Sequence, residues 1–252
     1  MTVLEAKDLG IDFGGLHALD DVYMKIEEGE IVGLIGPNGA GKTTVFNLLT
    51  GVYVPTKGAI RFEGKSIIGR KPFQITQAGI ARTFQNIRLF KGMTVLDNIK
   101  VAMNHRMHYS LLSAIFRLPG YWKEEREVDS RARELLAVFG MEELGDQMAA
   151  NLPYGSQRKL EILRALAAQP KLLLLDEPAA GMNPTETMGL MEGIRTIRDR
   201  FKVSILLIEH DMSLVMNVCE RLCVLDYGTL IAAGAPDEVR KDPKVISAYL
   251  GG

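Results

Sequence analysis

The stretch IVGLIGPNGAGKTT, residues 31–44, decides the fold. It starts with a short apolar run that is typical of a buried strand, passes through a glycine-rich loop, and continues into TTVFNLLT, whose apolar residues fall on one helical face. Residues 36–43, GPNGAGKT, match the pattern G-x-x-x-x-G-K-[ST] in full. Because this pattern lies between a predicted strand and a predicted helix, the sequence indicates a phosphate-binding loop rather than a glycine turn that matches by chance.

The residue types in this phosphate loop, residues 36–43, suit nucleotide phosphates and a magnesium ion. Glycines let backbone N–H groups wrap around phosphate oxygens, and the N-terminus of the following helix adds partial positive charge. We expect the Lys42 side chain to reach the β- and γ-phosphates and the Thr43 hydroxyl to bind Mg²⁺. The residues predicted to bind ATP here are Gly36, Pro37, Asn38, Gly39, Ala40, Gly41, Lys42, Thr43 and Thr44.

A second apolar run, LLLLDEP at residues 172–178, ends in two adjacent carboxylates. Consecutive leucines are typical of a strand buried on both faces of a sheet, and ligands bind at the carboxyl ends of such strands. Two charges there need a cationic partner. We expect Asp176 to hold Mg²⁺, directly or through water, and Glu177 to polarise a water for attack on the γ-phosphate. Taken alone, the pair could equally be acidic residues near the start of a helix.

Two further polar residues follow predicted strands. Gln85 ends GIARTFQ, residues 79–85, which we expect to be a strand or an extended segment, and His210 follows the apolar strand of LLIEHD. We expect Gln85 to sense the magnesium ion and the γ-phosphate, and His210 to lie within reach of the γ-phosphate. A single histidine at a strand end is more often structural, and only the other motifs favour a catalytic role.

The two outer parts of the chain read as alternating strands and helices. The predicted strands before residue 86 are 3–13, 22–26, 31–36 and the AIRFEG run that follows a turn at 55–58. After residue 168 we predict strands 171–175, 203–208 and 221–226, a helix 184–201 capped by Asn183, and a short helix from 212. The first strands are expected to be antiparallel.

A predicted helical insert separates these parts. From Thr94, which begins a capping pattern, to about residue 168 the chain is expected to be mostly helical. The sequence predicts a break at Pro119–Gly120 and a helix 123–139 that Gly140 ends. An insert of this kind gives two lobes whose relative angle can change.

Length and composition are those of an ordinary globular protein. The chain has 252 residues, 47% of them hydrophobic, and a formal net charge of −1. It has no basic run long enough to follow a nucleic-acid backbone, so nucleic-acid binding gains no support. The N-terminus does not read as a signal peptide and no apolar run reaches about 18 residues, which predicts a cytosolic chain. Cys219 and Cys223 are predicted to be reduced core thiols.

The ordered motifs resemble the ATP-binding subunits of ABC transporters over essentially the whole chain. They are GPNGAGKTT, Gln85, LPYGSQ at residues 152–157, LLLLDEP, the AAGMNP turn and His210. Within that family, RTFQNIRLF, EPAAGMNP and IEHDMSLVM are most similar to the ATPases of branched-chain amino-acid importers. The resemblance implies an α/β fold with a P-loop NTPase (RecA-like) core at 1–85 and 169–252, an N-terminal antiparallel β region, and an inserted α-helical subdomain at 86–168.

The resemblance also implies an ATPase that powers solute import. Two such subunits would sandwich two ATP molecules, each held by the phosphate loop of one chain and the signature loop, here around Gly155, of the other. Phe13 is expected to stack on adenine, with a place in the core as the alternative. The residues expected to act in catalysis are Lys42, Gln85, Glu177 and His210, and the expected metal ligands are Thr43, Gln85 and Asp176.

The partners implied are transmembrane permease chains, a second ATP-binding subunit and, indirectly, an extracytoplasmic solute-binding protein, which would place the chain at the cytoplasmic face of a membrane. An exporter or a lipid-extracting ATPase would share the catalytic residues and differ in the docking surface around 86–122. A soluble ABC ATPase of translation or DNA repair usually carries two nucleotide domains or a long coiled-coil insert. A nucleotide kinase is a further alternative, and it is disfavoured because it would need an acceptor pocket and has no use for the signature loop.

Two positions depart from the family pattern. The signature loop usually reads Leu-Ser-Gly-Gly-Gln, and Pro153 stands where its phosphate-binding serine is expected. Asn183 stands where an aspartate is usual. Because Pro153 weakens the loop that would face the partner's ATP, we expect a heterodimer with a different ATPase, with a homodimer as the alternative.

Two other features carry little weight in the sequence. His105 and His108 could share a helix face, but with no carboxylate or cysteine nearby we expect them to be surface residues rather than metal ligands. The apolar stripe within residues 111–118 is expected to be a core face with partial exposure, and a contact for a membrane partner is the alternative.

Overall fold

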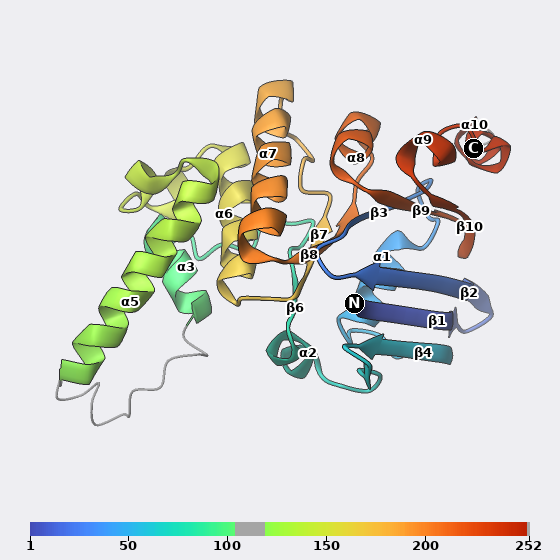
Figure 1. Ribbon diagram of the computed structural model, residues 1–252, viewed down its shortest axis with the longest axis horizontal. Helices are drawn as coiled ribbons and strands as arrows, with labels where there is room; N and C mark the ends of the chain where they lie inside the picture. Colours follow the sequence, from blue (N-terminus) through green and yellow to red (C-terminus); the bar gives the residue numbers. More distant parts are fainter. Residues whose placement is uncertain (104–118, 251–252) are drawn as a thin grey trace.

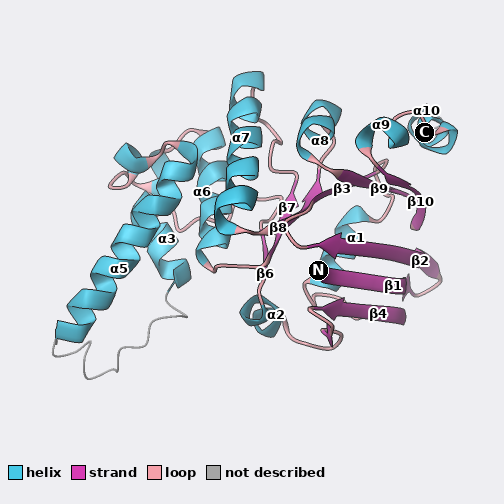
Figure 2. Cartoon of the chain, in the orientation of Figure 1, coloured by secondary structure: helices cyan, strands magenta, loops and turns pink. Residues whose placement is uncertain are grey.

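The strands form two sheets that pack against each other (Figures 1 and 2). The structure is a computed structural model that describes residues 1–103 and 119–250. The antiparallel sheet has the order β2-β1-β4-β5, with β1 at Thr2–Phe13, β2 at Leu16–Glu27, β4 at Lys57–Phe62 and β5 at Lys65–Ser66. The second sheet has the order β10-β9-β3-β8-β7-β6, with β3 at Ile31–Ile35, β6 at Ile80–Arg82, β7 at Leu172–Asp176, β8 at Ser204–Ile208, β9 at Arg221–Asp226 and β10 at Thr229–Gly234.

Helices lie around this second sheet and extend beyond one side of it (Figure 1). They are α1 (Lys42–Leu49), α2 (Pro72–Ala78), α3 (Val95–Met103), α5 (Pro119–Leu136), α6 (Tyr154–Ala167), α7 (Pro184–Phe201), α8 (Met212–Val218), α9 (Pro236–Val239) and α10 (Pro243–Leu250). Three short 3₁₀ turns join α5 to α6, at Ala137–Phe139, Glu142–Leu144 and Ala149–Asn151. No helix in the described ranges is both long and apolar enough to cross a membrane.

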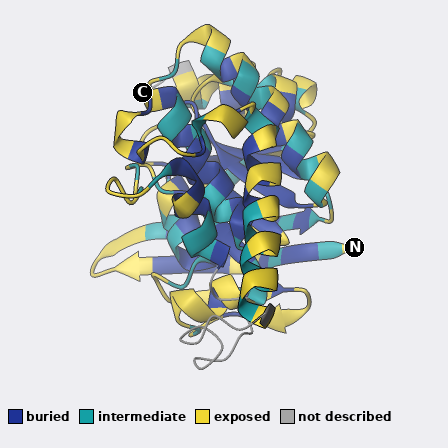
Figure 3. Cartoon of the chain, turned by 90° about the vertical axis from the view of Figure 1, so that its left-hand side faces the viewer, coloured by how far each residue is buried: buried dark blue, intermediate teal, exposed yellow. Residues whose placement is uncertain are grey.

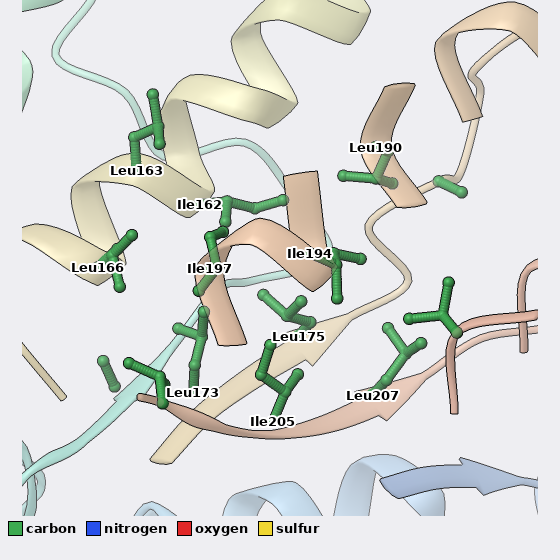
Figure 4. Packing of buried hydrophobic residues seen from close by; sticks show 14 of the residues in the cluster. Ile162, Leu163, Leu166, Leu173, Leu175, Leu190, Ile194, Ile197, Ile205 and Leu207 are labelled. Carbon is green, nitrogen blue, oxygen red and sulfur yellow. The ribbon is translucent and has the colours of Figure 1, made fainter. Parts of the chain in front are cut away.

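The central strands of the second sheet are buried on both faces, as their apolar sequences predict. Every residue of β3, β7 and β8 is buried. Because side chains alternate along a strand, Leu173 and Leu175 join the cluster under α6 and α7, whereas Leu172 and Leu174 join the cluster with α1 and the antiparallel sheet. Figure 4 shows the first cluster, in which α7 residues pack onto β7 and β8. The strand ends are therefore held rigidly from both sides.

The antiparallel region differs from the prediction in length. Strand β2 begins at Leu16, well before the predicted start at residue 22. Its pairing with β1 contains several register shifts, and Asp21 has a positive φ of 56°. Irregularities of this kind let a strand continue through polar residues that interrupt its alternation. The predicted strand 22–26 is thus only the regular end of a longer strand.

The helices next to the sheet begin and end close to their predicted positions. The predicted cap of α7 is confirmed, because Asn183 Oδ1 accepts from the Glu186 N–H at 2.9 Å while Glu186 Oε2 accepts from the Asn183 N–H at 2.9 Å. Thr94 Oγ1 likewise accepts from the Asp97 N–H at 3.0 Å, just before α3. Helix α1 is followed by Gly51, which has a positive φ of 70°.

Helices α3, α5 and α6 pack on one another at the side of the molecule (Figure 1). The predicted break at Pro119–Gly120 coincides with the start of α5, whose first residue is Pro119, where its missing N–H costs nothing. The helix therefore begins before the predicted start at residue 123. Helix α5 ends at Leu136 and passes into a 3₁₀ turn before Gly140, which has a positive φ of 63°. His105, His108 and the stripe within 111–118 lie outside the described residues. In Figure 3, exposed residues follow the outer helical surface and buried residues lie in the strands at the centre, whereas some strand ends at the edge of the molecule are exposed.

Several elements have no counterpart in the sequence prediction. Strand β6 contains only three residues, so most of the predicted extended segment 79–85 lies beyond it. Helix α2, strand β10 and the C-terminal helices α9 and α10 were not predicted. The two cysteines are free and buried as predicted, and burial raises the pKa of Cys219 to about 12 and that of Cys223 to about 11.

Candidate functional site

The phosphate loop connects β3 to α1 and depends on glycine at its first position. Gly36 has a φ of 146°, and a Cβ there would lie 2.0 Å from the Leu225 carbonyl oxygen, which excludes any side chain. Gly39 and Gly41 also have positive φ values, 81° and 105°. The loop therefore places its backbone directly before α1, where helix N-terminal N–H groups lack intrahelical partners and attract anions.

The residues between these glycines border open space. Pro37, Asn38, Gly39 and Ala40 line a cleft of about 740 Å³ whose opposite wall includes Tyr227 and residues of α10. Thr43 is exposed and Thr44 half-buried in the first turn of α1. An anionic ligand can reach this loop from solvent, as the predicted role of the loop requires.

Lys42 is folded back onto the loop. Its side chain is buried, and Nζ donates to the carbonyl oxygens of Gly36 at 2.7 Å and Pro37 at 2.8 Å. Burial lowers the pKa of Lys42, and the nearby charges of Glu177 and Asp176 offset part of that effect. An ammonium whose hydrogen bonds go to neutral carbonyls can exchange those partners for phosphate oxygens.

Asp176 ends strand β7 in a buried position. Its backbone N–H donates to Thr83 Oγ1 at 3.2 Å, and its Oδ2 accepts from Arg82 Nη2 at 2.7 Å. The sequence led us to expect magnesium as the cation beside Asp176, and the structure adds a second cation there, an arginine of β6. This ion pair was not predicted from the sequence, because it joins residues from distant parts of the chain.

Glu177 lies at the next position and leaves the sheet. It has a positive φ of 47°, which is uncommon for a residue with a side chain, and its N–H donates to the Ile208 carbonyl at 2.9 Å. Backbone in this region is strained and tends to occur at functional sites. The turn separates the Glu177 side chain from Asp176, although the two residues are adjacent.

Gln85 and His210 both meet Glu177. Gln85 Nε2 donates to Glu177 Oε2 at 3.0 Å, and His210 Nε2 lies 2.5 Å from Glu177 Oε1. The His210 side chain is 48% exposed and that of Glu177 is 16% exposed. The structure therefore brings three of the predicted catalytic residues into one cluster that remains open to solvent.

Glu209 holds the backbone beside this cluster. Sequence reasoning did not identify it. Its buried carboxylate accepts from the N–H groups of Ala179 at 2.7 Å, His210 at 3.0 Å and Asp211 at 3.4 Å. Burial raises the pKa of Glu209, while these backbone hydrogen bonds lower it by less. The signal in the sequence was an acidic residue at the end of an apolar strand, next to His210. Glu209 ties the turn after Glu177 to the turn that carries His210.

Gly155 lies at the second residue of α6, packed against α7. A Cβ on Gly155 would lie 2.5 Å from Glu186 Oε1, so a larger residue there would displace the Glu186 side chain. Pro153 precedes the helix with φ −54° and ψ 153° and gives it no side-chain cap. In this chain Asn183, the second departure from the family pattern, caps α7 through Glu186. The signature loop and the turn after Glu177 are thus neighbours.

Phe13 is not a core residue. Its side chain is 43% exposed, and its ring lies 5.1 Å from that of Tyr53 in an edge-on arrangement. The alternative of a core position is therefore wrong. An exposed aromatic pair of this kind offers a flat surface for another ring.

The donor set near the phosphate loop suits a hard cation. The Thr43 hydroxyl, the Asp176 carboxylate and the Gln85 side-chain carbonyl supply only oxygen, which is what Mg²⁺ prefers, and Mg²⁺ commonly takes the rest of its ligands from water and phosphate. The residues present therefore fit a nucleotide-bound Mg²⁺.

Comparison with known proteins agrees with this arrangement. The family model described as "ABC transporter" matches residues 19–180, and that described as "Branched-chain amino acid ATP-binding cassette transporter" matches residues 229–252. The chain is 45% identical to the high-affinity branched-chain amino acid transport ATP-binding protein BraF of Pseudomonas aeruginosa and 47% identical to LivG of Salmonella typhimurium, covering 99% of this chain and 98% of each relative.

A solved structure shows the same fold over the full length. It is the ADP conformation of an ATP-binding cassette of an ABC transporter, with a TM-score of 0.86, 33% identity and complete coverage of both chains. The predicted α/β fold with an antiparallel β region and a helical subdomain is thereby confirmed. Since the family model covers more than half of the chain and the relatives cover nearly all of it, the chain belongs to the ABC transporter family, as one of its ATP-binding ATPase subunits.

Proposed function

We propose that this chain hydrolyses ATP to power the import of branched-chain amino acids through a membrane complex. The observation that carries the proposal is the convergence of Gln85 and His210 on the carboxylate of Glu177, at the sheet edge that also holds Asp176. The substrate class is supported by the names of the relatives, which are branched-chain amino acid transport ATP-binding proteins.

Nucleotide binding in this proposal uses the phosphate loop and an aromatic platform. Backbone N–H groups of residues 38–44 would surround the phosphates, and Lys42 would exchange its bonds to the Gly36 and Pro37 carbonyls for bonds to the β- and γ-phosphates. The exposed ring of Phe13 would stack on adenine.

Thr43, Asp176 and Gln85 would hold Mg²⁺. A bound Mg²⁺ would supply positive charge that stabilises the negative charge developing on the phosphates during transfer. Gln85 uses its Nε2 for Glu177, which leaves its side-chain oxygen for such a ligand role. The same side chain then links the carboxylate cluster to the nucleotide.

Hydrolysis needs a water positioned against the γ-phosphate and a group that accepts its proton. Glu177 is suited to accept it, because its carboxylate is largely shielded and is oriented by two partners. His210 is exposed enough to contact a bound γ-phosphate, and its bond to Glu177 would then be shared or exchanged. Glu209 would keep His210 in place through its backbone hydrogen bonds.

Transport requires partners that this chain would contact through its helical side. We propose a core of residues 1–85 and 169–252, a helical subdomain of residues 86–168 that receives permease chains at the cytoplasmic membrane face, and a second ATP-binding subunit whose ATP meets Gly155. A solute-binding protein would act indirectly, on the other side of the membrane. Helix α6 packs against α7, so the two lobes share a contact surface. A change in the relative angle of the lobes would be transmitted across this surface.

The test is uptake by proteoliposomes that contain the complete complex purified with its permease chains. We expect ATP-dependent accumulation of leucine, isoleucine and valine, no accumulation of an acidic or basic amino acid, and loss of uptake with Glu177→Gln. ATP-dependent transport restricted to another class of solute, or outward movement of lipid, would overturn the proposed substrate. A complex that accumulates leucine without hydrolysing ATP would overturn the proposed mechanism.

A further inference from the structure

A buried arginine lies behind the proposed magnesium site. Arg82 is the last residue of β6, and its side chain is only 8% exposed. Nη2 donates to Asp176 Oδ2 at 2.7 Å, and the Asp176 side chain is 5% exposed. A charge-assisted bond between two groups so deeply buried fixes the orientation of the carboxylate.

The same guanidinium reaches the helix that follows the phosphate loop. Nη1 of Arg82 donates to Asn47 Oδ1 at 2.7 Å. Asn47 lies on α1, four residues after Thr43, so the two residues share one face of that helix. Arg82 therefore joins the element that carries Thr43 to the strand that ends in Asp176.

Neighbouring side chains limit the freedom of Arg82. Its Cζ lies 5.4 Å from the ring centroid of Phe46 and 5.3 Å from that of Phe84, the residue before Gln85. Its Nε is buried and has no hydrogen-bond partner among the described residues. A buried donor without a partner is unfavourable, so the guanidinium is oriented for its two Nη contacts at the expense of Nε. The planar guanidinium of arginine can donate to two partners in fixed directions, and a lysine ammonium cannot replace it.

We propose that Arg82 is a positioning residue for the magnesium site. By holding Asp176 and Asn47 together, Arg82 sets the distance between the carboxylate and the Thr43 helix, so that both can serve one ion. The alternative is that Arg82 competes with Mg²⁺ for Asp176. The fixed position of the guanidinium and its use of only one carboxylate oxygen favour positioning. This inference rests on the proposed nucleotide site.

The test measures binding of a fluorescent ATP analogue by the full chain, in EDTA and during titration with Mg²⁺. For Arg82→Lys and Arg82→Gln we expect affinity in EDTA close to that of the wild type, and a Mg²⁺ concentration for half-maximal enhancement raised by roughly 10–100-fold, as for other residues that orient metal ligands. Asn47→Ala keeps the charge beside Asp176 and should shift the same value in the same direction by less.

Arg221→Gln is the matched control, because Arg221 also forms a partly buried pair, with both oxygens of Glu30 at 2.7 and 3.0 Å, but on β9. It should lower the melting temperature without changing the Mg²⁺ requirement. If Arg82→Gln does not fold, Arg82→Lys and Asn47→Ala decide the question.

Each other outcome overturns the inference. An unchanged Mg²⁺ requirement would remove Arg82 from the site, and a lower requirement would make it a competitor. Equal losses of nucleotide affinity in EDTA and in Mg²⁺ would show that Arg82 has a purely structural role. If the wild-type chain showed no Mg²⁺-dependent nucleotide binding, the proposed function itself would be overturned. If only the role of Arg82 is wrong, the wild type still binds nucleotide in a Mg²⁺-dependent way.

Discussion

Glu177 combines a left-handed backbone with a carboxylate bound from two directions. Its φ of 47° turns the side chain away from Asp176 and toward Gln85 and His210. Two adjacent acidic residues thereby obtain different surroundings, one paired with a buried arginine and the other with neutral or titratable partners at the surface. Different surroundings are what allow two like groups to take different chemical roles.

Glu177→Gln should leave Mg-ATP binding intact and lower the turnover number by roughly 10²–10⁴, the usual contribution of a positioned general base. The substituted side chain keeps an oxygen and similar size, so the phosphate loop and Asp176 are undisturbed. Steady-state hydrolysis and calorimetric ATP binding, measured on the same preparation, check the two halves of the prediction. Hydrolysis near the wild-type rate would remove Glu177 from the role of base.

Glu209 gives a pH-dependent prediction. Burial raises its pKa above the value of 4.5 for an unperturbed carboxyl, so the folded chain holds this proton more tightly than the unfolded chain. The stabilising contribution of the protonated group is full below the unfolded pKa and is lost as pH rises through the folded pKa. Glu209→Gln imitates the protonated carboxyl and should gain stability relative to the wild type as pH rises.

Urea unfolding of wild type and Glu209→Gln at a series of pH values from 4.5 to 8 checks this sign, starting at that unperturbed value. The exposed Glu238→Gln is a suitable control, since its difference from the wild type should not follow the same trend. A free-energy difference between Glu209→Gln and wild type that stays constant over the series would contradict the raised pKa.

Among the elements, α6 has a connection that its amphipathic pattern does not reveal. Arg158 is buried on α6 and its guanidinium donates to the carbonyl oxygens of Phe84 at 2.9 Å and Gln85 at 2.5 Å. Glu161, one turn later, accepts from the Arg88 N–H at 3.3 Å. Helix α6, which starts at the signature loop, therefore holds the backbone of Gln85 in place through Arg158.

Arg158→Met should loosen this segment while the helix remains folded. A hydrogen bond to a charged group contributes about 1.5–3 kcal/mol, so we expect amide exchange in residues 84–88 to rise at least roughly tenfold. Hydrogen exchange with mass spectrometry on the isolated chain measures it. Lys159→Met, a change on the same helix at a residue over the Phe139 ring, is the control. Unchanged exchange at 84–88 in the Arg158 variant would show that α6 does not hold this segment.

The elements also show what sequence can and cannot predict. The unit β3–phosphate loop–α1 and the capped helix α7 were predicted because their signals are local: an apolar run, glycines, and Asn183 three residues before Glu186. Arg82, Arg158 and Glu209 were missed because their partners lie far along the chain or in the backbone. The three residues of β6 are a strand only through pairing with β7, and a longer extended segment was predicted there.

At the scale of the whole molecule, the proposed complex has a second ATP-binding subunit facing the site of this chain, and Pro153 bears on which subunit that is. Pro153 supplies neither a hydroxyl nor an N–H, and it offers α6 no side-chain cap. The N–H groups of the first turn of α6 remain, with Gly155 packed on α7. A partner's γ-phosphate would therefore meet backbone donors without the usual serine.

We predict that this chain pairs with a different ATPase and that the site containing Glu177 performs most of the hydrolysis. In such a heterodimer only the partner's ATP would meet the weakened loop, whereas Lys42, Asp176 and Glu177 would face the partner's signature loop. The measurement changes Glu177 here and the matching glutamate of the partner one at a time in the reconstituted complex. The first change should lower the ATPase rate much more than the second. Pro153→Ser, which restores the hydroxyl, should raise the rate that remains after the Glu177 change. Equal losses from the two glutamates, or full activity of a complex built only from this chain, would mean that the helix N-terminus suffices and both sites work alike.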